Sequence, residues 1–340
     1  MEEYKFTKFF NNFTRDNINL FMKSKYNLSN DNILLKKIRK KKESVLGFIS
    51  KNNINPKIDI IDKIDINIKE LLGTVWVYEK GVIQWLEKNV VKYYKISWLN
   101  NIITIICKEE QMKNIKNRIK TICNILDYLK SKSKNPCDYN IILLLTDLKK
   151  LKPTKNIIGP KHINTGYTDL YTKQIFIWRY EEFEKVLFHE AIHFLDLDCR
   201  EHRVSLDINI DGPKSYYEAI TDYIAIFYHI IYISIITNID IKLLLELELG
   251  FIRNQALSVN NHFKLGDWNG MITKMIKQKS PAFSYYILKY LLFSYLLEND
   301  IKYNAAKQDY NEILNKLIKI GFKQNEFNDI ESYRMTLLQL

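Results

Sequence analysis

The feature that most constrains the fold is the segment of residues 216–236, which is apolar on almost every side of a helix. Such a helix has to be buried, because no face of it suits water. The sequence Asp211-Gly212-Pro213 before it is typical of a helix start. The segment nevertheless contains Glu218 and Asp222, and a buried carboxylate is costly unless it is paired or bound to a metal. We therefore expect the chain to fold around this helix, with partners for both carboxylates.

We interpret this segment as a core helix and not as a membrane span. Its most apolar run, residues 223–236, is shorter than the ~18 apolar residues that a span needs, and it contains His229. The first residues lack the basic-then-apolar pattern of a signal peptide. The four cysteines form no CxxC pair, which fits a reducing compartment. These features predict an intracellular, cytoplasmic protein with no membrane partner.

The order of the expected elements predicts an α+β fold. Residues 1–70 are polar and are expected to form a helical N-terminal extension, followed by one domain over residues 71–340. Strands are expected at residues 74–78, 94–99, 102–108, 140–146, 163–168 and 174–179, a helix at 109–130, and mainly helices after residue 181. Asn100-Asn101 is a hairpin signal between the second and third strands. An α+β lobe over about residues 71–200 would thus precede a mainly helical lobe over about 201–340.

The formal net charge of +12 is weak evidence for a partner. Lys, Asn and Ile are used heavily along the whole chain, as in a protein encoded by AT-rich DNA, and this bias raises the Lys content without selecting for a ligand. We interpret the basic cluster at residues 36–42 as a solvated helix face. Nucleic-acid binding through this cluster is the alternative, and it is not the partner that we expect.

Residues 189–193 read His-Glu-Ala-Ile-His inside an expected helix that begins near residue 181. Positions i and i+4 of a helix lie about 40° apart around its axis, so His189 and His193 project side by side and can bind one metal ion. Glu190 lies about 100° away, beside the metal and not on it. There it can polarise a metal-bound water. The pattern therefore predicts a metal site with Glu190 as its catalytic base.

A tetrahedral catalytic zinc needs a third protein ligand, and the chain offers three candidates. The extended pattern requires a glycine seven residues and a histidine ten residues after His189, but Asp196 and Cys199 stand there. His202 has no supporting pattern. Glu218 is preferred because its surroundings are apolar. Asp222 shares its helix face, so that one carboxylate can ligate the metal while the other accepts the free N–H of a metal-bound histidine.

His189-Glu190-x-x-His193 followed by Glu218-x-x-x-Asp222 resembles the gluzincins, the thermolysin-like clan of zinc metallopeptidases. The resemblance implies a zincin-like fold, in which a mixed sheet with a backing helix and the active-site helix form an upper lobe above a mainly helical lower lobe. It implies one Zn2+ ion on His189, His193 and Glu218, Glu190 as general base and acid, and Asp222 as the carboxylate behind a ligand histidine. The composition and residues 164–179 also look similar to zinc metallopeptidases of large DNA viruses, which would place the protein in the host cytoplasm or the virion.

The resemblance further implies hydrolysis of a protein or peptide substrate, with endopeptidase or exopeptidase activity left open. The edge strand of such enzymes binds the substrate backbone as an added strand, which points to residues 164–167, with Asn164 and Gly166 as candidates. Tyr285 and Tyr286 are candidate donors to the oxyanion, or else core residues, and His262 is a weaker candidate. The alternative is a catalytically silent protein of the same fold with a structural or interaction role, for example in a virion.

Overall fold

The computed structural model describes residues 26–64, 67–150, 152–153, 157–198, 206, 208–266, 268–298 and 333–338. The chain forms two compact units. The sheet unit comprises Lys42–Lys150 and Asn164–Leu197, and the helical unit comprises Met1–Lys41, Leu151–Ile163 and Asp198–Leu340. Helix α3 (Ile33–Asn52) contributes residues to both units. The described residues form helices and a mixed sheet, which agrees with the expected combination of helices and strands, while the zincin-like arrangement stays a prediction.

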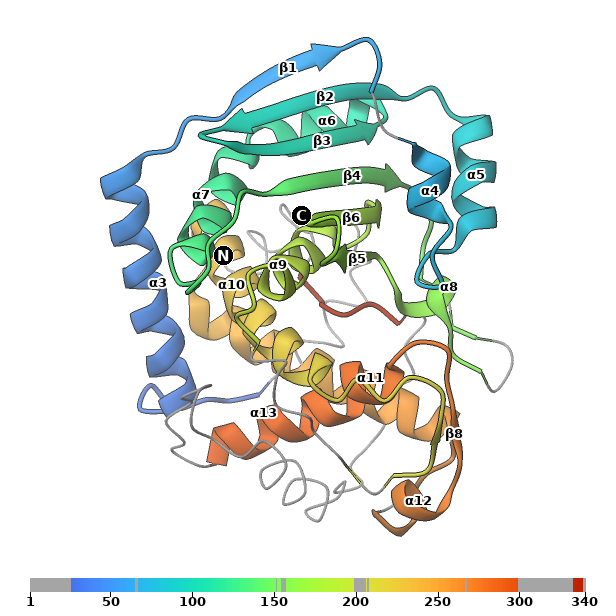
Figure 1. The fold of residues 1–340 in the computed structure, drawn as a ribbon. Helices are drawn as coiled ribbons and strands as arrows, with labels where there is room; N and C mark the ends of the chain where they lie inside the picture. Colours follow the sequence, from blue (N-terminus) through green and yellow to red (C-terminus); the bar gives the residue numbers. More distant parts are fainter. Residues whose placement is uncertain are drawn as a thin grey trace. The chain divides into compact units, whose positions relative to one another are not determined.

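The sheet unit is built on a six-stranded mixed sheet with the order β1-β2-β3-β4-β6-β5 (Figure 1). Its strands are β1 (Lys57–Ile61), β2 (Lys92–Trp98), β3 (Asn101–Cys107), β4 (Asn140–Thr146), β5 (Gly166–Asp169) and β6 (Gln174–Arg179). The pairs β3–β4 and β4–β6 are parallel, and the other three pairs are antiparallel. The central strands β3, β4 and β6 carry nearly continuous runs of buried residues, as strands covered on both faces do.

Strands β2 and β3 form the hairpin that the sequence predicts. Their register pairs Trp98 with Asn101, so that Leu99 and Asn100 form a two-residue turn. Leu99 has a φ of 50°, which agrees with the left-handed backbone that two-residue hairpin turns require. The Asn101 side chain, which is fully buried, donates to the backbone oxygen of Trp98 at 3.2 Å and closes the turn. The predicted hairpin is therefore present, and its turn is Leu99-Asn100, one residue earlier than the expected Asn100-Asn101.

The helices of the sheet unit are α4 (Ile68–Leu72), α5 (Glu79–Lys88), α6 (Glu109–Lys116), α7 (Ile119–Lys130) and α9 (Phe183–Phe194). The single helix expected at 109–130 is thus two helices separated by Asn117 and Arg118. Helix α9 packs against β5, β6 and α7. A cluster of buried side chains from β3, β4 and β6, including Ile142 and Trp178, forms a core with residues of α4 and α5.

Two expectations for this unit were wrong. Residues 57–61 form the edge strand β1, paired with β2, and not part of a helical extension. Hydrogen bonds to β2, which lies farther along the chain, hold β1 as a strand, and such long-range pairing is not visible in a local sequence pattern. Residues 74–78 form turns before α5 and no strand, and Val75 is 77% exposed. Residues 33–52 of the expected extension form the helix α3, and residues 1–25 lie outside the described part of the chain.

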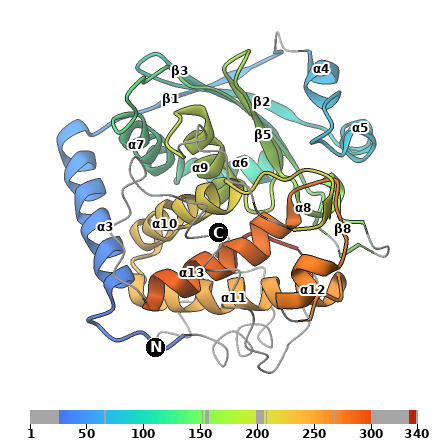
Figure 2. The ribbon, with the colours of Figure 1, turned by 60° about the horizontal axis from the view of Figure 1, so that its bottom comes forward.

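The helical unit contains the apolar helix on which the sequence argument began. Its elements are α8 (Pro160–Ile163), β7 (Ile210–Asp211), α10 (Glu218–Thr237), α11 (Ile241–His262), α12 (Trp268–Thr273), β8 (Ile276–Lys277), the π-helix η1 (Phe283–Leu288) and α13 (Lys289–Glu298). Helix α10 packs against α11, η1 and α13, and Figure 2 shows α10, α11 and α13 side by side. The expected start signal instead ends β7, where Gly212 at φ 128° allows the backbone to approach Gln278. Helix α10 therefore begins later, at Glu218.

Helix α10 is 20 residues long and is the one helix among the described residues that is long and apolar enough to cross a membrane. From the sequence, the apolar run of residues 223–236 was expected to be too short to span a membrane, but the helix that contains it is long enough. Within the protein, 78% of its most apolar window is buried. A helix that is apolar all round and enclosed by neighbouring helices is the pattern of a core helix.

Candidate metal centre

Helix α9 is held in place by buried ion pairs at its start. All twelve of its residues are buried, so its charged side chains need partners inside the protein. Glu184 pairs with Arg118 at 2.5 Å, and both side chains are nearly inaccessible. Glu182, at the N-cap with a left-handed φ of 55°, pairs with the fully buried Lys150. Burial lowers the pKa of Lys150, although the Glu182 carboxylate opposes this shift. These pairs fix the position of the helix that carries His189 and His193.

The two histidines of α9 point their ring nitrogens at the same place. Their Nε2 atoms lie 3.1 Å apart, and their rings are nearly perpendicular at 84°. Two nitrogen ligands of a tetrahedral zinc, each bound at about 2.0–2.1 Å, stand about 3.3 Å apart. The observed separation is close to this value. The spacing of four residues on the helix therefore brings the two Nε2 atoms to the separation expected for two ligands of one metal ion, as the sequence predicted.

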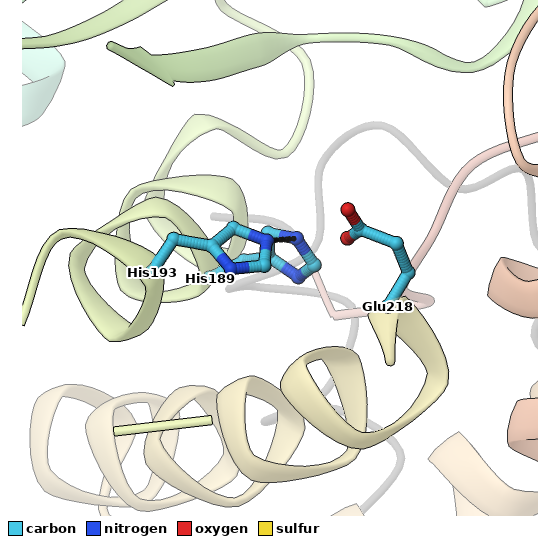
Figure 3. A group of neighbouring side chains, drawn as sticks. All are labelled: His189, His193 and Glu218. Atoms are coloured by element: carbon cyan, nitrogen blue, oxygen red, sulfur yellow. Dashed lines mark hydrogen bonds between the residues drawn. The ribbon is translucent and has the colours of Figure 1, made fainter. Parts of the chain in front are cut away.

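Glu218 completes a group of three metal-ligating side chains. One ligand atom from each of His189, His193 and Glu218 lies within 4.8 Å of the other two (Figure 3). The three residues are 2%, 7% and 8% exposed. Glu218 is the first residue of α10, and this position directs its carboxylate toward the two imidazoles in Figure 3. Two imidazoles and one carboxylate suit a zinc ion with a fourth position for water. The residues therefore fit a metal site, as the sequence predicted.

Glu190, the residue after His189 on α9, is contacted by a strand of the sheet. The Thr168 hydroxyl, on β5, lies 2.8 Å from Glu190 Oε2 and 3.0 Å from the Glu190 backbone oxygen. The hydroxyl has one hydrogen and can donate it to either oxygen, of which the carboxylate oxygen is the closer. The Glu190 side chain is 6% exposed. The carboxylate is thus held in a defined orientation, which a proton-transferring group requires.

Asp222 has a charged partner that the sequence argument did not include. Lys289, the first residue of α13, donates to Asp222 Oδ2 at 2.7 Å. The two side chains are 1% and 0% exposed. This ion pair explains how one of the two carboxylates of α10 tolerates burial. The predicted hydrogen bond from a ligand histidine to Asp222 stays a prediction.

The two candidate tyrosines differ in how their hydroxyl groups are placed. Tyr286 is fully buried, and its hydroxyl donates to the backbone oxygen of Tyr333 at 2.6 Å. A hydroxyl has one hydrogen, so in this conformation Tyr286 has none for an oxyanion. Tyr285, which also lies on η1, is half-buried. The structure thus favours Tyr285 over Tyr286, and the role itself stays a prediction.

The remaining histidines lie apart from this group in the sequence and have other surroundings. His229 is a core residue of α10 at 2% exposed. His162 is buried in α8, where its Nδ1 accepts from the backbone N–H of Gly159. His262 ends α11, packed against Phe263. Cys199 and His202, the other candidate ligands, lie outside the described residues.

The predicted substrate-binding residues lie at the start of an edge strand. β5 is the last strand in the sheet order, so one of its edges has no strand partner in the described chain. Asn164 precedes it, and its side-chain amide donates to the backbone oxygen of Trp76 at 3.0 Å. Its backbone oxygen accepts from Arg179 Nε at 2.9 Å. These contacts hold the residues before β5 in place, while substrate binding by Asn164 and Gly166 stays a prediction.

Gly166 allows β5 to lie close to β6 and α9. A methyl group on its Cα would stand 2.8 Å from the Phe176 backbone oxygen. We therefore expect Gly166→Ala to lower the free energy of unfolding by about 1–3 kcal/mol, as overpacking does, measured by urea unfolding. Gly47→Ala is the matched control, since nothing lies within 4 Å of the new methyl group in α3, and it should raise stability by up to about 1 kcal/mol. Equal effects of the two changes would contradict this account.

No protein-family model matches this chain, and no curated protein or solved structure matches it. The family resemblance therefore rests on the residues of the motif alone. What the structure adds is the proximity of three buried ligand side chains that lie up to 29 positions apart in the sequence, from His189 to Glu218 (218 − 189 = 29). This proximity is compatible with a zinc site.

Sequence reasoning missed two residues that support this site. Lys289 is a single charge within a long apolar stretch, residues 281–297. A buried charge needs a partner, so this context points to an acidic partner for Lys289 in the same way as for Glu218. Thr168 is different, since a threonine in a strand is ordinary. Nothing in the sequence points from Thr168 to Glu190.

Proposed function

We propose that this protein is a zinc-dependent metallopeptidase of the gluzincin type, with a zincin-like arrangement of its sheet and helices. The observation that carries the proposal is the convergence of His189, His193 and Glu218 within 4.8 Å, with Glu190 on the same helix as the histidines. The group of three ligands alone, or the position of Glu190 alone, would be weak evidence for a hydrolytic site. A three-ligand group with a fixed carboxylate next to it is the composition of a hydrolytic metal site.

The donor set supports zinc in particular. Imidazole nitrogen and carboxylate oxygen are ligands that zinc accepts, and three protein ligands leave one position open. A zinc ion in such a site acts as a Lewis acid, lowering the pKa of water and polarising a substrate carbonyl. The chain supplies the remaining functions, which are to move a proton and to bind and orient the substrate.

Glu190 is the residue proposed to move the proton. Its carboxylate takes a proton from the attacking water and passes it to the amine that leaves when the peptide bond breaks. Thr168 holds Oε2 of this carboxylate at 2.8 Å, so Oε1 is the oxygen proposed to exchange the proton. Tyr285 is proposed as the donor to the developing oxyanion.

The proposed substrate is a peptide in extended conformation. The edge of β5 without a strand partner in the described chain offers backbone groups to such a peptide. Thr168 lies on β5 and contacts Glu190 on α9. A peptide added to this edge would therefore lie next to the proposed base. We propose that residues 164–166 bind the substrate backbone there.

The purified protein is expected to bind one zinc ion per chain and to cleave members of a peptide library. Removal of the metal with a chelator should abolish cleavage, and added zinc should restore it. Zinc content is measured by elemental analysis, and cleavage is measured by mass spectrometry of the products. A chain that holds zinc and cleaves nothing would contradict the peptidase and favour the catalytically silent alternative.

A further inference from the structure

The described C-terminal residues 333–338 form a buried peptide within the helical unit, red in Figure 1. Tyr333, Met335, Thr336, Leu337 and Leu338 are between 0% and 5% exposed. The segment has no helix or strand of its own. Its backbone polar groups therefore cannot be satisfied by regular structure, and they need partners from the helices around it.

Side chains of three helical elements supply these partners. Tyr286 of η1 donates to the Tyr333 backbone oxygen at 2.6 Å. Lys289 of α13 donates to the Met335 backbone oxygen at 3.3 Å. Glu248 of α11 accepts from the Leu337 backbone N–H at 3.1 Å and from the Thr336 hydroxyl at 2.9 Å. We call this set of three side chains the tail groove. It binds the segment chiefly through its backbone, as a peptide-binding site does.

Lys289 connects the tail groove to the candidate metal centre. The same Nζ that donates to Met335 donates to Asp222 Oδ2 at 2.7 Å. Asp222 lies four residues after Glu218 on α10, and positions four apart lie on one helix face. The ammonium group thus joins the C-terminal peptide to the helix turn that presents Glu218. All of these residues belong to the helical unit.

We propose that the tail groove is a peptide-binding site whose occupant, residues 333–338, raises the affinity of the metal centre by holding Lys289 against Asp222. This inference rests on the proposed function for the identity of the metal. Without the segment, Lys289 loses its contact with Met335, and Glu248 loses its contacts with Thr336 and Leu337. Water would then reach the Lys289–Asp222 pair, and the attraction between two charges is weaker in water than in a buried environment. Lys289 is a positioning residue, since it acts on Glu218 through Asp222 and α10.

The experiment compares a chain that ends at residue 332 with one that ends at residue 338, which keeps every described contact. Zinc affinity is measured by competition with a chromophoric chelator. We expect the shorter chain to bind zinc about 10–100-fold more weakly, as when outer partners of a metal site are lost. A synthetic peptide of residues 333–340, labelled with a fluorophore, should bind the shorter chain and restore its zinc affinity. The same peptide with Thr336→Val should bind at least about tenfold more weakly.

Full-length point variants keep the inference testable if the shorter chain does not fold. Lys289→Met should weaken zinc binding at least about tenfold, and Lys289→Arg, which keeps the charge, should recover most of that loss. Lys277→Met, at an exposed lysine, is the control and should leave zinc affinity unchanged. The thermal unfolding midpoint of each metal-free variant separates a loss of stability from a loss of affinity.

The outcomes separate this inference from the peptidase proposal. Equal zinc affinity of the 332 and 338 chains, or of Lys289→Met and the original, would overturn the inference and leave the peptidase untouched. Zinc-binding chains that follow the expected pattern but cleave no peptide would overturn the peptidase alone. A full-length chain that binds no zinc would overturn both, while peptide binding would still report on the groove.

Discussion

Glu190→Gln is expected to lower kcat for peptide cleavage by about 10²–10⁴-fold while zinc stays bound at one ion per chain. Removing a general acid–base group costs a factor of this size. Glutamine has nearly the same shape and accepts the same hydrogen bond from Thr168, which lies 2.8 Å from Oε2. It cannot, however, take up a proton at neutral pH. The variant therefore removes one chemical function from the site and leaves the metal ligands in place.

The measurement is single-turnover cleavage of a peptide identified from the library, with zinc content determined on the same sample. Glu110→Gln is the matched control, since Glu110 is exposed at the start of α6 and should leave both quantities unchanged. A Glu190→Gln variant that cleaves at the original rate would show that Glu190 is not the base. A variant that loses zinc would place Glu190 among the groups that hold the metal.

The histidine pair could be predicted because its geometry is local. A spacing of four residues on a helix brings two side chains together wherever the helix lies, and the structure places the two Nε2 atoms 3.1 Å apart. Glu218 required a long-range argument, namely that a carboxylate in an apolar helix needs a partner. Its proximity to the histidines is compatible with that argument. Both predictions used rules that hold before the rest of the fold is known.

The errors in the fold come from segments whose structure is decided by distant partners. β1 alternates polar and apolar residues over its first four positions, but it is only five residues long and has no fully buried residue, so its strand signal is short. Its pairing with β2 decides its conformation. Residues 74–78 show the reverse, because their β-branched and aromatic side chains favour a strand but no strand pairs with them in the described chain. The presence or absence of a distant partner strand decided the conformation of both segments.

The residues that contact Asp222 and Glu190 were harder to predict from the sequence than the candidate metal ligands. Lys289 contacts Asp222 across 67 positions of sequence, and Thr168 contacts Glu190 across 22. Such pairs depend on how whole elements pack, which a single sequence does not specify. The ligands follow from chemistry at a few positions. Their orientation depends on contacts that only the folded chain brings together.

His193→Ala is expected to weaken zinc binding by more than about 100-fold. Loss of an outer hydrogen-bond partner costs a metal site about 10–100-fold, and loss of one of three ligands removes a direct bond to the ion. Glu218→Ala should have an effect of similar size, because its carboxylate is the only oxygen donor of the group. Zinc affinity is measured by competition with a chromophoric chelator at pH 7.

The same variants give a second readout through protein stability. A ligand that binds only the folded state at 100 times its Kd adds about 2.7 kcal/mol of stability, so zinc should raise the Tm of the original chain. His193→Ala and Glu218→Ala should show little of this rise, because their zinc affinity is low. Glu110→Ala is the control, since Glu110 is exposed at the start of α6 and should keep the full rise. If Glu218→Ala kept it while His193→Ala did not, the histidines would bind the metal with a different third residue, and α10 would lose its place in the site.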